Sequence, residues 1–403
     1  MKKNENEPQI IFLNQVSGRL FQELAEGLAD SGDGQCLLYT GSDKSNEIKN
    51  TSNLKIIKAP EYHRGNYYSR LLDWFKYFWF VFWSVLKQPS SALIFIVSNP
   101  PFLPLVGYLM KKLRGQPYVV LIYDIYPDLA IYLGKMSRRG FLTRMWRCFN
   151  EIAWQNSEAV FTIGGDMAVK LEGMFKANHT RLGRVAVIPN WADHNFIKPL
   201  SKEKNWFAQK YGQVDKFTVL YSGNLGATHD LETILKAAKE LGDFNDIRFL
   251  IIGDGYKRAY IEKFIDQEKL SNILLLPFQA ENVLPYSLTT GDVAVITLSK
   301  GVEGLSVPGK VYYAMAGGSA LLCISSGNNE LKTIIGKHQC GISVEPGDVE
   351  GFVSAIKRFY EDSIFLKNCK ENARKAVKSY YTKKNIGKYR EILVDKLKLF
   401  HNN

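Results

Sequence analysis

The stretch from residue 292 to residue 324 constrains the fold more than any other part of the sequence. Residues 292–298 and 320–324 are short apolar runs with the pattern of buried β-strands. Between them, residues 301–318 read GVEGLSVPGKVYYAMAGG, a glycine-rich loop that leads into a helix starting at Val311. Strands joined through a helix in this way run parallel, so the sequence predicts an α/β fold.

The loop in this unit has the composition of a phosphate-binding loop. Loops at the carboxyl ends of parallel strands are where open α/β sheets bind ligands. Its glycines let the backbone approach a phosphate closely, and the N–H groups of the following helix face the same space. Glu303 and Lys310 are the only charged residues in 301–318. We expect Glu303 to accept hydrogen bonds from sugar hydroxyls and Lys310 to hold a phosphate, although many such loops bind nothing.

The same alternation of apolar runs, polar loops and helical segments extends over the chain of 403 residues. Strands are predicted at 10–14, 36–40, 53–57, 92–97, 118–123, 159–163, 185–188, 217–221, 248–252, 273–276, 292–298, 320–324 and 342–344. The polar stretch 195–215 reads as a connection between domains. We therefore predict two Rossmann-like, doubly wound domains, 1–200 and 201–383, facing across a cleft, with a last helix, 384–403, packing back on the first.

Four loops of the second half follow consecutive strands, so a doubly wound sheet should bring them to one edge. These loops are SGNLG at 222–226, GDG at 253–255, PF at 277–278 and EGLSVPGK at 303–310. The residues expected to bind a nucleoside diphosphate there are Gly223, Asn224, Gly253, Gly255, Phe278 and Val307. His229 and Lys257 follow the first two loops and read more simply as surface residues, although His229 could touch a phosphate.

Several kinds of chemistry lack their motifs in this sequence. The absence of GxxxxGK[ST] argues against a P-loop ATPase, and the absence of a DxD pair argues against a divalent ion held beside a sugar nucleotide. The five cysteines are scattered without a CxxC motif, which favours a reducing compartment and disfavours a zinc site. The charged first residues do not resemble a signal peptide, so we expect a cytoplasmic protein. Because the sequence has no DxD pair, we expect no metal, and we expect no other cofactor.

A net charge of +12 and an aromatic segment concern the partners of the chain. Residues 71–86 read LLDWFKYFWFVFWSVL, which is too short and too interrupted by Asp73 and Lys76 for a single membrane span. The segment is either a buried helix or a helix with one face at a membrane interface. Residues 129–150 carry five lysines and arginines and no acid, which fits a solvated helix face or contact with anionic lipid at the inner membrane face. No sequence pattern favours nucleic acid.

Taken together, these motifs resemble glycosyltransferase family 4, whose members have the GT-B fold. The resemblance covers essentially the whole chain and is closest to bacterial enzymes that build capsule, O-antigen or colanic-acid-type polysaccharides. The motifs that carry it are DIYPD at 124–128, IPNWAD at 188–193, YSGNLG at 221–226, IGDG at 252–255, EGLSVPGK at 303–310 and AGG at 316–318. It implies a retaining transferase that uses a nucleotide-activated sugar, usually a UDP-sugar, without a metal.

The resemblance also assigns roles to single residues. Glu303 matches the first glutamate of the family's paired motif, which contacts the donor sugar, and Tyr313 stands where the second glutamate holds the ribose. Asn224 stands at the position of an arginine that binds the diphosphate in many members, and Lys310 would take over that role. In the first half, Asp124 would lie near the acceptor hydroxyl. Gly18, after the first strand, would approach the diphosphate.

The expected function is therefore transfer of a sugar from a nucleoside diphosphate, with UDP as the expected nucleotide, to a lipid-linked saccharide. Asp124, Glu303 and Lys310 are the expected catalytic residues, although Asp124 could equally be a helix cap or a satisfied loop carboxylate. Two alternatives remain open. A GT-B-type sugar-nucleotide epimerase would share the architecture, and a non-catalytic sugar-nucleotide-binding subunit would fit the tyrosine at position 313.

Overall fold

Two compact units make up the chain, and the computed structural model describes residues 9–32, 34–41, 51–63, 67–175 and 185–397 of them. The first unit consists of residues 1–189 and 383–403, and the second consists of residues 190–382. The chain therefore passes from one unit to the other twice. The predicted last helix, 384–403, extends beyond residue 397 and lies outside the described residues there.

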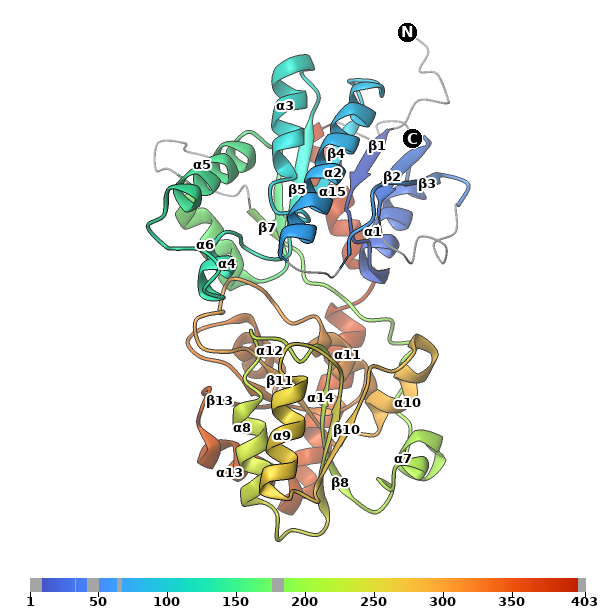
Figure 1. Cartoon of the computed structure of the whole chain (residues 1–403). Coiled ribbons are helices and arrows are strands. Elements are labelled where there is room, and N and C mark those ends of the chain that lie inside the picture. The colour runs from blue at the N-terminus through green and yellow to red at the C-terminus, as the bar shows by residue number, and fades with distance from the viewer. Residues whose placement is uncertain (1–8, 33, 42–50, 64–66, 176–184, 398–403) are drawn as a thin grey trace. The chain divides into compact units, whose positions relative to one another are not determined.

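The first unit contains a seven-stranded sheet with the order β3-β2-β1-β4-β5-β6-β7, and every neighbouring pair is parallel (Figure 1). Its strands are β1 (Ile10–Leu13), β2 (Cys36–Thr40), β3 (Leu54–Lys58), β4 (Leu93–Val97), β5 (Tyr118–Ile122), β6 (Val160–Thr162) and β7 (Val185–Val187). Its helices are α1 (Arg19–Ala29), α2 (Tyr67–Leu86), α3 (Pro104–Arg114), α4 (Asp128–Tyr132), α5 (Phe141–Gln155), α6 (Gly165–Met174) and α15 (Asn385–Leu397).

The second unit contains a six-stranded sheet with the order β10-β9-β8-β11-β12-β13, again entirely parallel. Its strands are β8 (Phe217–Ser222), β9 (Ile247–Ile252), β10 (Ile273–Leu276), β11 (Val293–Thr297), β12 (Ala320–Ile324) and β13 (Gly341–Val344). Its helices are η2 (Lys202–Lys204), α7 (Trp206–Lys210), α8 (Glu232–Glu240), α9 (Arg258–Glu268), η3 (Glu281–Val283), α10 (Leu284–Thr289), α11 (Lys310–Gly317), α12 (Glu330–His338), α13 (Val349–Glu361) and α14 (Ser363–Tyr380).

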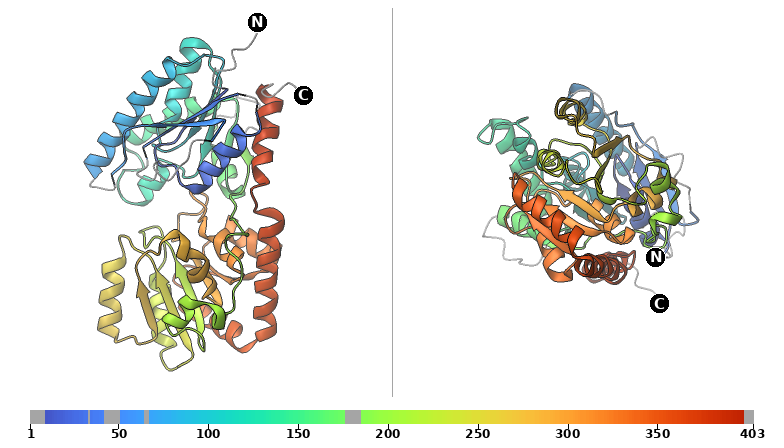
Figure 2. Two further views of the ribbon diagram at one scale, coloured as in Figure 1. Left: turned by 90° about the vertical axis from the view of Figure 1, so that its right-hand side faces the viewer. Right: turned by 90° about the horizontal axis from the view of Figure 1, so that it is seen from below.

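The prediction of an α/β fold with two doubly wound sheets is confirmed. The central strands β1, β4, β5, β11 and β12 are buried along their whole length. Strands covered on both faces need apolar residues at every position, which explains why the sequence shows continuous apolar runs and not an alternating pattern. In the left-hand view of Figure 2, the yellow helix α9 and the red helix α14 lie on opposite sides of the second sheet.

The last helix, α15, packs on the first unit although it is the final element of the chain. The ring of Tyr389 is fully buried and lies 4.8 Å from the ring of Phe161, measured between centroids. At the start of α15, Asn385 Nδ2 donates to Pro189 O at 3.1 Å, and Lys383 Nζ pairs with Glu23 Oε1 at 3.0 Å. A buried aromatic ring and these polar contacts hold α15 against α1 and the sheet.

The boundary between the units lies at Pro189, eleven residues before the predicted boundary at residue 200. The segment after Pro189 packs within the second unit, because Trp191 is buried and Arg374 donates to Ile197 O at 3.0 Å. The predicted connection, 195–215, is also part of this unit and contains α7. Asn205 is fully buried, accepts from Phe207 N at the start of α7 and donates to Tyr286 O at 2.8 Å.

The aromatic helix α2 has one buried and one exposed face, so the prediction of a buried helix is confirmed for one face, and contact of the other face with a membrane stays a prediction. Tyr77, Phe78, Val81 and Val85 are buried, together with Trp74. On the other face, large apolar side chains are at least half exposed: Leu72, Phe75, Trp79 and Trp83. Over the described residues, none of the helices has the length and apolar character that a membrane span requires.

Candidate active site

A pocket of about 190 Å³ opens in the second unit where the order of the strands reverses. β8 and β11 are neighbours there, and the remaining strands continue outward from β8 on one side and from β11 on the other. Open α/β sheets bind ligands at such a point, beyond the carboxyl ends of the strands. Gly223, Phe278, Lys310 and Tyr313 all line the pocket. The four predicted residues thus come from two different loops and from α11.

The glycine loops beside the pocket are packed too closely for any side chain. A Cβ atom on Gly253 would lie 1.9 Å from the carbonyl oxygen of Gly223, and one on Gly255 would lie 2.6 Å from Asn224 Oδ1. Two backbone hydrogen bonds join these loops, from Gly223 N to Ile252 O and from Leu225 N to Asp254 O, both at 2.9 Å. The GDG motif therefore supports the shape of the SGNLG loop, in which Gly223 lines the pocket without a side chain.

Lys310 is held over an aromatic ring at the edge of the pocket. Its Nζ donates to Tyr221 Oη at 2.8 Å and lies 4.0 Å from the centroid of the same ring. Tyr221 Oη in turn donates to Asn224 O at 2.6 Å, so the tyrosine connects Lys310 to the SGNLG loop. Burial of the ammonium group lowers the pKa of Lys310 to about 7. Near neutral pH the side chain is therefore partly charged and partly neutral. An anion in the pocket would favour the charged form.

The start of α11 contributes less than the sequence suggested. The N–H groups of Val311 and Tyr312 donate to Pro308 O at 3.1 Å and to Gly309 O at 3.2 Å. These two N–H groups are therefore engaged within a tight first turn and do not face a ligand. The side chain of Lys310 is the group of this loop that reaches the pocket.

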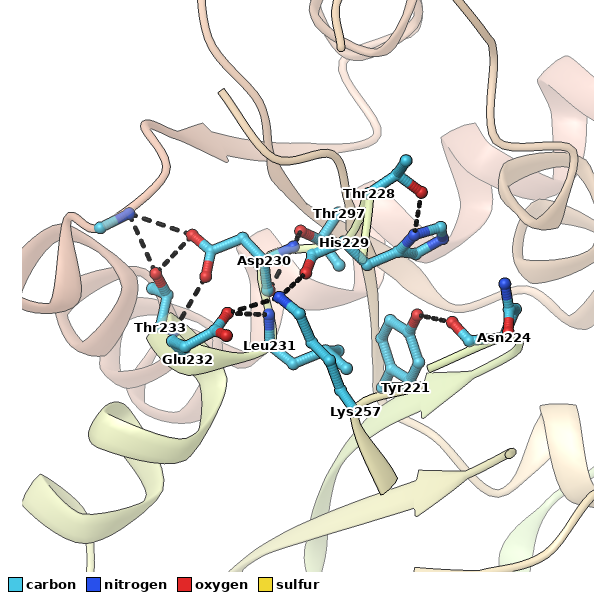
Figure 3. A network of polar contacts seen from close by, with 11 residues as sticks. Tyr221, Asn224, Thr228, His229, Asp230, Leu231, Glu232, Thr233, Lys257 and Thr297 are labelled. Atoms are coloured by element: carbon cyan, nitrogen blue, oxygen red, sulfur yellow. Dashed lines mark hydrogen bonds and ion pairs between the residues drawn. The ribbon is translucent and has the colours of Figure 1, made fainter. Parts of the chain in front are cut away.

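His229 and Lys257 lie in a polar network next to the pocket and are not simple surface residues (Figure 3). Lys257 Nζ donates to His229 O at 2.7 Å and to Glu232 Oε2 at 2.9 Å. The ring of His229 contacts Thr228 Oγ1 through Nδ1 at 3.0 Å. Burial, followed by the charges of Lys310 and Lys257, lowers the pKa of His229 to about 2. The imidazole is therefore neutral at physiological pH and offers one N–H donor and one acceptor.

Asp230, drawn in the same view, fixes the loop that follows the SGNLG motif (Figure 3). Its carboxylate accepts from Thr233 N at 3.1 Å, from Thr233 Oγ1 at 2.6 Å and from Gly347 N at 3.0 Å. Its own N–H donates to Thr297 Oγ1 at the end of β11, at 2.9 Å. The buried carboxylate thus joins the start of α8 to the loop before α13, and the backbone N–H of the same residue joins both to β11. This network sets the position of His229, which precedes Asp230 directly.

Comparison with known proteins identifies this unit. Residues 202–376 match the family described as glycosyl transferases group 1. The second unit is a group 1 glycosyltransferase domain. It occupies most of residues 190–382, and the chain that contains it is a glycosyltransferase.

Two bacterial relatives extend the similarity of this glycosyltransferase beyond its second unit. The probable glycosyltransferase WbjE of Pseudomonas aeruginosa is 25% identical over 308 residues, which cover 75% of this chain and 75% of WbjE. The putative colanic acid biosynthesis glycosyl transferase WcaI of Escherichia coli (strain K12) is 28% identical over 260 residues, which cover 62% of this chain and 61% of WcaI.

Solved structures show the same fold as the whole glycosyltransferase. Sucrose-phosphate synthase from Thermosynechococcus elongatus superposes with a TM-score of 0.75 at 16% identity, covering 96% of this chain and 99% of that chain. HepE from Anabaena in complex with UDP-glucose gives 0.72 at 14% identity over the same shares. WaaG, a glycosyltransferase of lipopolysaccharide biosynthesis, gives 0.70 at 14% identity, covering 95% and 99%. The fold of the chain is therefore GT-B, as the sequence predicted.

Glu303 of the glycosyltransferase lies outside the lining of the pocket and has two partners of its own. Its carboxylate accepts from Gly301 N at 2.7 Å, and it also accepts from the hydroxyl of Ser326. Glu303 therefore joins the loop after β11 to the loop after β12. Val307, another predicted donor-binding residue, is buried and does not line the pocket either.

The two remaining predicted site residues, Gly18 and Asp124, belong to the first unit. Gly18 is the residue before α1, and Gly18 O accepts from Phe21 N at 3.0 Å. Asp124 follows β5. Burial, and then the negative charge of Asp124, raise the pKa of Tyr126 to about 12. The loop that contains Asp124 and Tyr126 is held by α5, where Asn150 Nδ2 donates to Tyr126 O at 2.7 Å.

The sequence analysis missed several residues that shape the site of the glycosyltransferase. Tyr221 was quoted only as part of a motif, because an aromatic residue at the end of an apolar strand resembles core. Ser326 follows β12 and carried no signal of its own beyond its position after a strand. Leu284 and Leu288 line the pocket from α10. These two leucines are spaced i,i+4 on one helix face and Phe278 precedes them, a pattern that could have indicated an apolar wall. Over the described part of the chain, no three His, Cys, Asp or Glu side chains are grouped as metal ligands.

Proposed function

We propose that this glycosyltransferase moves a sugar from a UDP-sugar to a lipid-linked saccharide in bacterial surface polysaccharide biosynthesis, with retention of the anomeric configuration. The observation that carries the proposal is the pocket in which Lys310 Nζ lies beside Gly223, a residue without a side chain. A Cβ atom on Gly223 would lie 3.4 Å from Lys310 Nζ, so a phosphate on this glycine can reach the ammonium group. A cation beside a glycine suits a diphosphate, because a phosphate can approach closely where no side chain stands and its negative charge needs a positive partner.

The remaining walls suit the rest of a nucleotide. Phe278 is about half exposed at the rim, where an aromatic ring can stack on a base. Leu284 and Leu288 provide an apolar surface below it. UDP is proposed as the nucleotide because HepE, which shares the fold, has been solved with UDP and with UDP-glucose. A role in surface polysaccharide biosynthesis is proposed because WcaI is described as a putative colanic acid enzyme.

The proposed reaction proceeds on the front face of the donor sugar. The bond between the anomeric carbon and the β-phosphate oxygen breaks, the acceptor oxygen bonds to that carbon, and the acceptor proton passes to the departing phosphate. Lys310 stabilises the negative charge that grows on this phosphate. Glu303 contacts the donor sugar, and Asp124 is kept as the residue near the acceptor hydroxyl. We propose that the transfer needs no metal, because the ammonium group of Lys310 meets the charge of the diphosphate.

A panel of UDP-, GDP- and TDP-sugars tests the proposal, with nucleotide release measured in the presence and absence of a polyprenyl-diphosphate saccharide extract. We expect acceptor-dependent release of UDP from one donor, and at least about a hundredfold lower turnover in Lys310→Ala, since one stabilising group at a leaving phosphate contributes that much. Tight binding of a donor without any turnover would contradict transfer. It would favour the non-catalytic subunit, for which Tyr313 in the pocket is the relevant observation.

The glycosyltransferase is further proposed to work as a peripheral protein at the inner face of the plasma membrane. Trp79 and Trp83 are 52% and 59% exposed on α2, and Phe141 at the start of α5 is 79% exposed. Arginines 138, 139 and 144 lie on or just before α5 and are exposed too. Exposed aromatic side chains next to basic ones suit the headgroup region of an anionic bilayer.

A further inference from the structure

A groove of about 690 Å³ lies in the first unit between α2, the start of α3 and the segment 135–149. Its volume falls in the range of about 300–1,000 Å³ that is typical of ligand pockets. Phe75, Phe78 and Trp79 form the wall on α2, and Phe141 and Met145 form part of the wall on α5. The groove belongs to the first unit alone and shares no residue with the pocket around Lys310.

The surface of this groove is apolar, and its large side chains are exposed together. Phe75, Trp79, Phe141, Leu142 and Met145 are between 38% and 79% exposed, although all five line the same hollow. Thr143 in the lining is bonded within the fold, since its Oγ1 donates to Ser137 O at 2.7 Å, whereas the buried Nε1 of Trp146, also in the lining, has no hydrogen-bond partner among the described residues. A contiguous apolar surface of this kind marks a place where another apolar molecule binds.

The rim of the groove carries positive charge on one side. Lys135 lines the groove and is exposed, and the exposed Arg138 and Arg139 follow in the same segment. Two acids on the elements that flank the groove are paired: Asp128 with Arg147 at 2.8 Å, and the buried Asp73 with His63 Nδ1 at 3.1 Å. An occupant with an anionic group at the end of an apolar body would match both the wall and the rim.

The concave shape argues for a single chain and against simple contact with a bilayer surface. A flat bilayer can cover the exposed edges of Trp79 and Phe141, but it cannot fill a hollow between two helices. A flexible hydrocarbon chain that bends out of the bilayer can fill it and buries the groove walls from water.

We propose that the groove between α2 and α5 binds the hydrocarbon chain of a phosphate-headed lipid, with the phosphate beside Lys135, Arg138 and Arg139. Resting on the proposed function, this lipid is the carrier of the acceptor saccharide. The groove would then be a second substrate site, separate from the donor pocket. It would hold the acceptor by its apolar tail, whichever sugar that tail carries.

Titration of the full chain with farnesyl phosphate, kept below its critical micelle concentration, tests the proposal by calorimetry. Farnesol and isopentenyl phosphate serve as probes without the anion and without the long chain. We expect farnesyl phosphate to bind at one site and both controls to bind at least about tenfold more weakly, because each lacks one half of the match.

Two groove variants and one matched control locate the binding. Trp79→Ser and Met145→Glu should each weaken binding of farnesyl phosphate about tenfold or more, because both side chains line the groove. Trp83→Ser should bind within about twofold of the unchanged protein, because Trp83 is similarly exposed on the same helix but does not line the groove. Thermal unfolding of each variant shows whether it is folded.

Equal binding by the unchanged protein and by a folded Met145→Glu would overturn the proposal. So would a dimer in analytical ultracentrifugation that Met145→Glu dissociates while farnesyl phosphate does not bind, since the groove would then join two copies of the chain. Transfer assays separate this inference from the proposed function. Groove-dependent binding without any sugar transfer supports the lipid site and contradicts the function, whereas transfer with an acceptor KM unchanged in Met145→Glu does the opposite.

Discussion

At the scale of single residues, the environment of Lys310 matters more than its presence in a glycine-rich loop. The sequence marked Lys310 because it is one of two charges in residues 301–318. The structure adds the ring and hydroxyl of Tyr221, which hold the ammonium group next to Gly223. Burial lowers the pKa of Lys310 to about 7, so a large fraction of the molecules carry a neutral lysine above neutral pH.

Binding of UDP at pH 8 should therefore take up a proton. Lys310 is mostly neutral there in the free protein, and a neighbouring diphosphate favours its charged form and raises its pKa. By linkage, the affinity for UDP should fall as the pH rises above 7, by up to about tenfold per unit. Calorimetric titration in Tris and in HEPES at pH 8 measures the uptake, because the two buffers differ in ionisation enthalpy.

Substitutions separate Lys310 from other sources of protons. Lys310→Met should abolish the uptake, whereas Lys300→Met, which removes an exposed lysine before the same loop, should retain it. Proton uptake that persists in Lys310→Met would contradict the assignment and point to another group at the diphosphate.

At the scale of elements, the loop between β8 and α8 depends on a single buried carboxylate. Asp230 accepts from Thr233 N and from Gly347 N, and its backbone N–H is bonded to Thr297 at the end of β11. Three separate segments therefore meet at one residue, two through its side chain and one through its backbone N–H, directly after His229 (Figure 3). A buried N–H group left without an acceptor costs about 1–3 kcal/mol.

Asp230→Ala should lower the free energy of unfolding by about 1–3 kcal/mol, since Thr233 N would lose its acceptor and Gly347 N would keep only Thr233 Oγ1. Asp243→Ala, at an exposed position after α8, should change it by less than about 0.5 kcal/mol. Chemical denaturation monitored by circular dichroism measures both values. Similar stability of the two variants would show that the network does not support the loop.

The elements also show why sequence reasoning succeeded for the strands and was less complete for the site. Buried parallel strands are continuous apolar runs in the sequence. The runs 292–298 and 320–324 therefore predicted the ends of β11 and β12 to within one residue. The GDG glycines were visible for a similar reason, because only glycine permits the contact of Gly253 with Gly223 O. Tyr221 and Ser326 could not be found, since their roles depend on partners 89 and 23 residues away.

At the scale of the whole molecule, the two faces of α2 separate a structural role from a binding role. Tyr77 and Val81 are buried in the first unit, whereas Trp79 and Trp83 are exposed. The 3.6-residue period of a helix can place both kinds of residue in one apolar stretch, but an aromatic residue at nearly every position hides the period. The sequence therefore left the buried and the membrane-facing alternatives open.

Trp79→Ser combined with Trp83→Ser should release the protein from liposomes that contain anionic lipid, with about a tenfold loss of partitioning. Both side chains are exposed, so the double variant should keep its thermal unfolding temperature within a few degrees. Val169→Ser, which removes an exposed apolar side chain on α6, should remain bound. Co-sedimentation with liposomes measures partitioning, and loss of folding in the double variant would mean that this face of α2 is core.

The boundaries of the units depend on which side chains are buried, and the polarity of a sequence stretch does not show this. Residues 195–215 are polar and looked like a linker, yet Asn205 and Phe207 are fully buried in the second unit. Asn205 can be buried because its side chain caps α7 and donates to Tyr286 O, so its polar atoms have hydrogen-bond partners. A polar residue thus forms part of a core. Only the partners of such a residue distinguish it from a loop residue.

The position of α15 has a consequence for the order in which the protein is made. Residues 1–189 leave the ribosome first, but Tyr389 and Lys383 complete their unit only after all of residues 190–382 have been synthesised. Until then the surface that α15 covers, around Phe161 and Glu23, is exposed to water and to other chains. The segment that contains α15 thus completes a unit whose other residues were synthesised before residues 190–382, and a nascent chain stalled before residue 383 would expose an unfinished core.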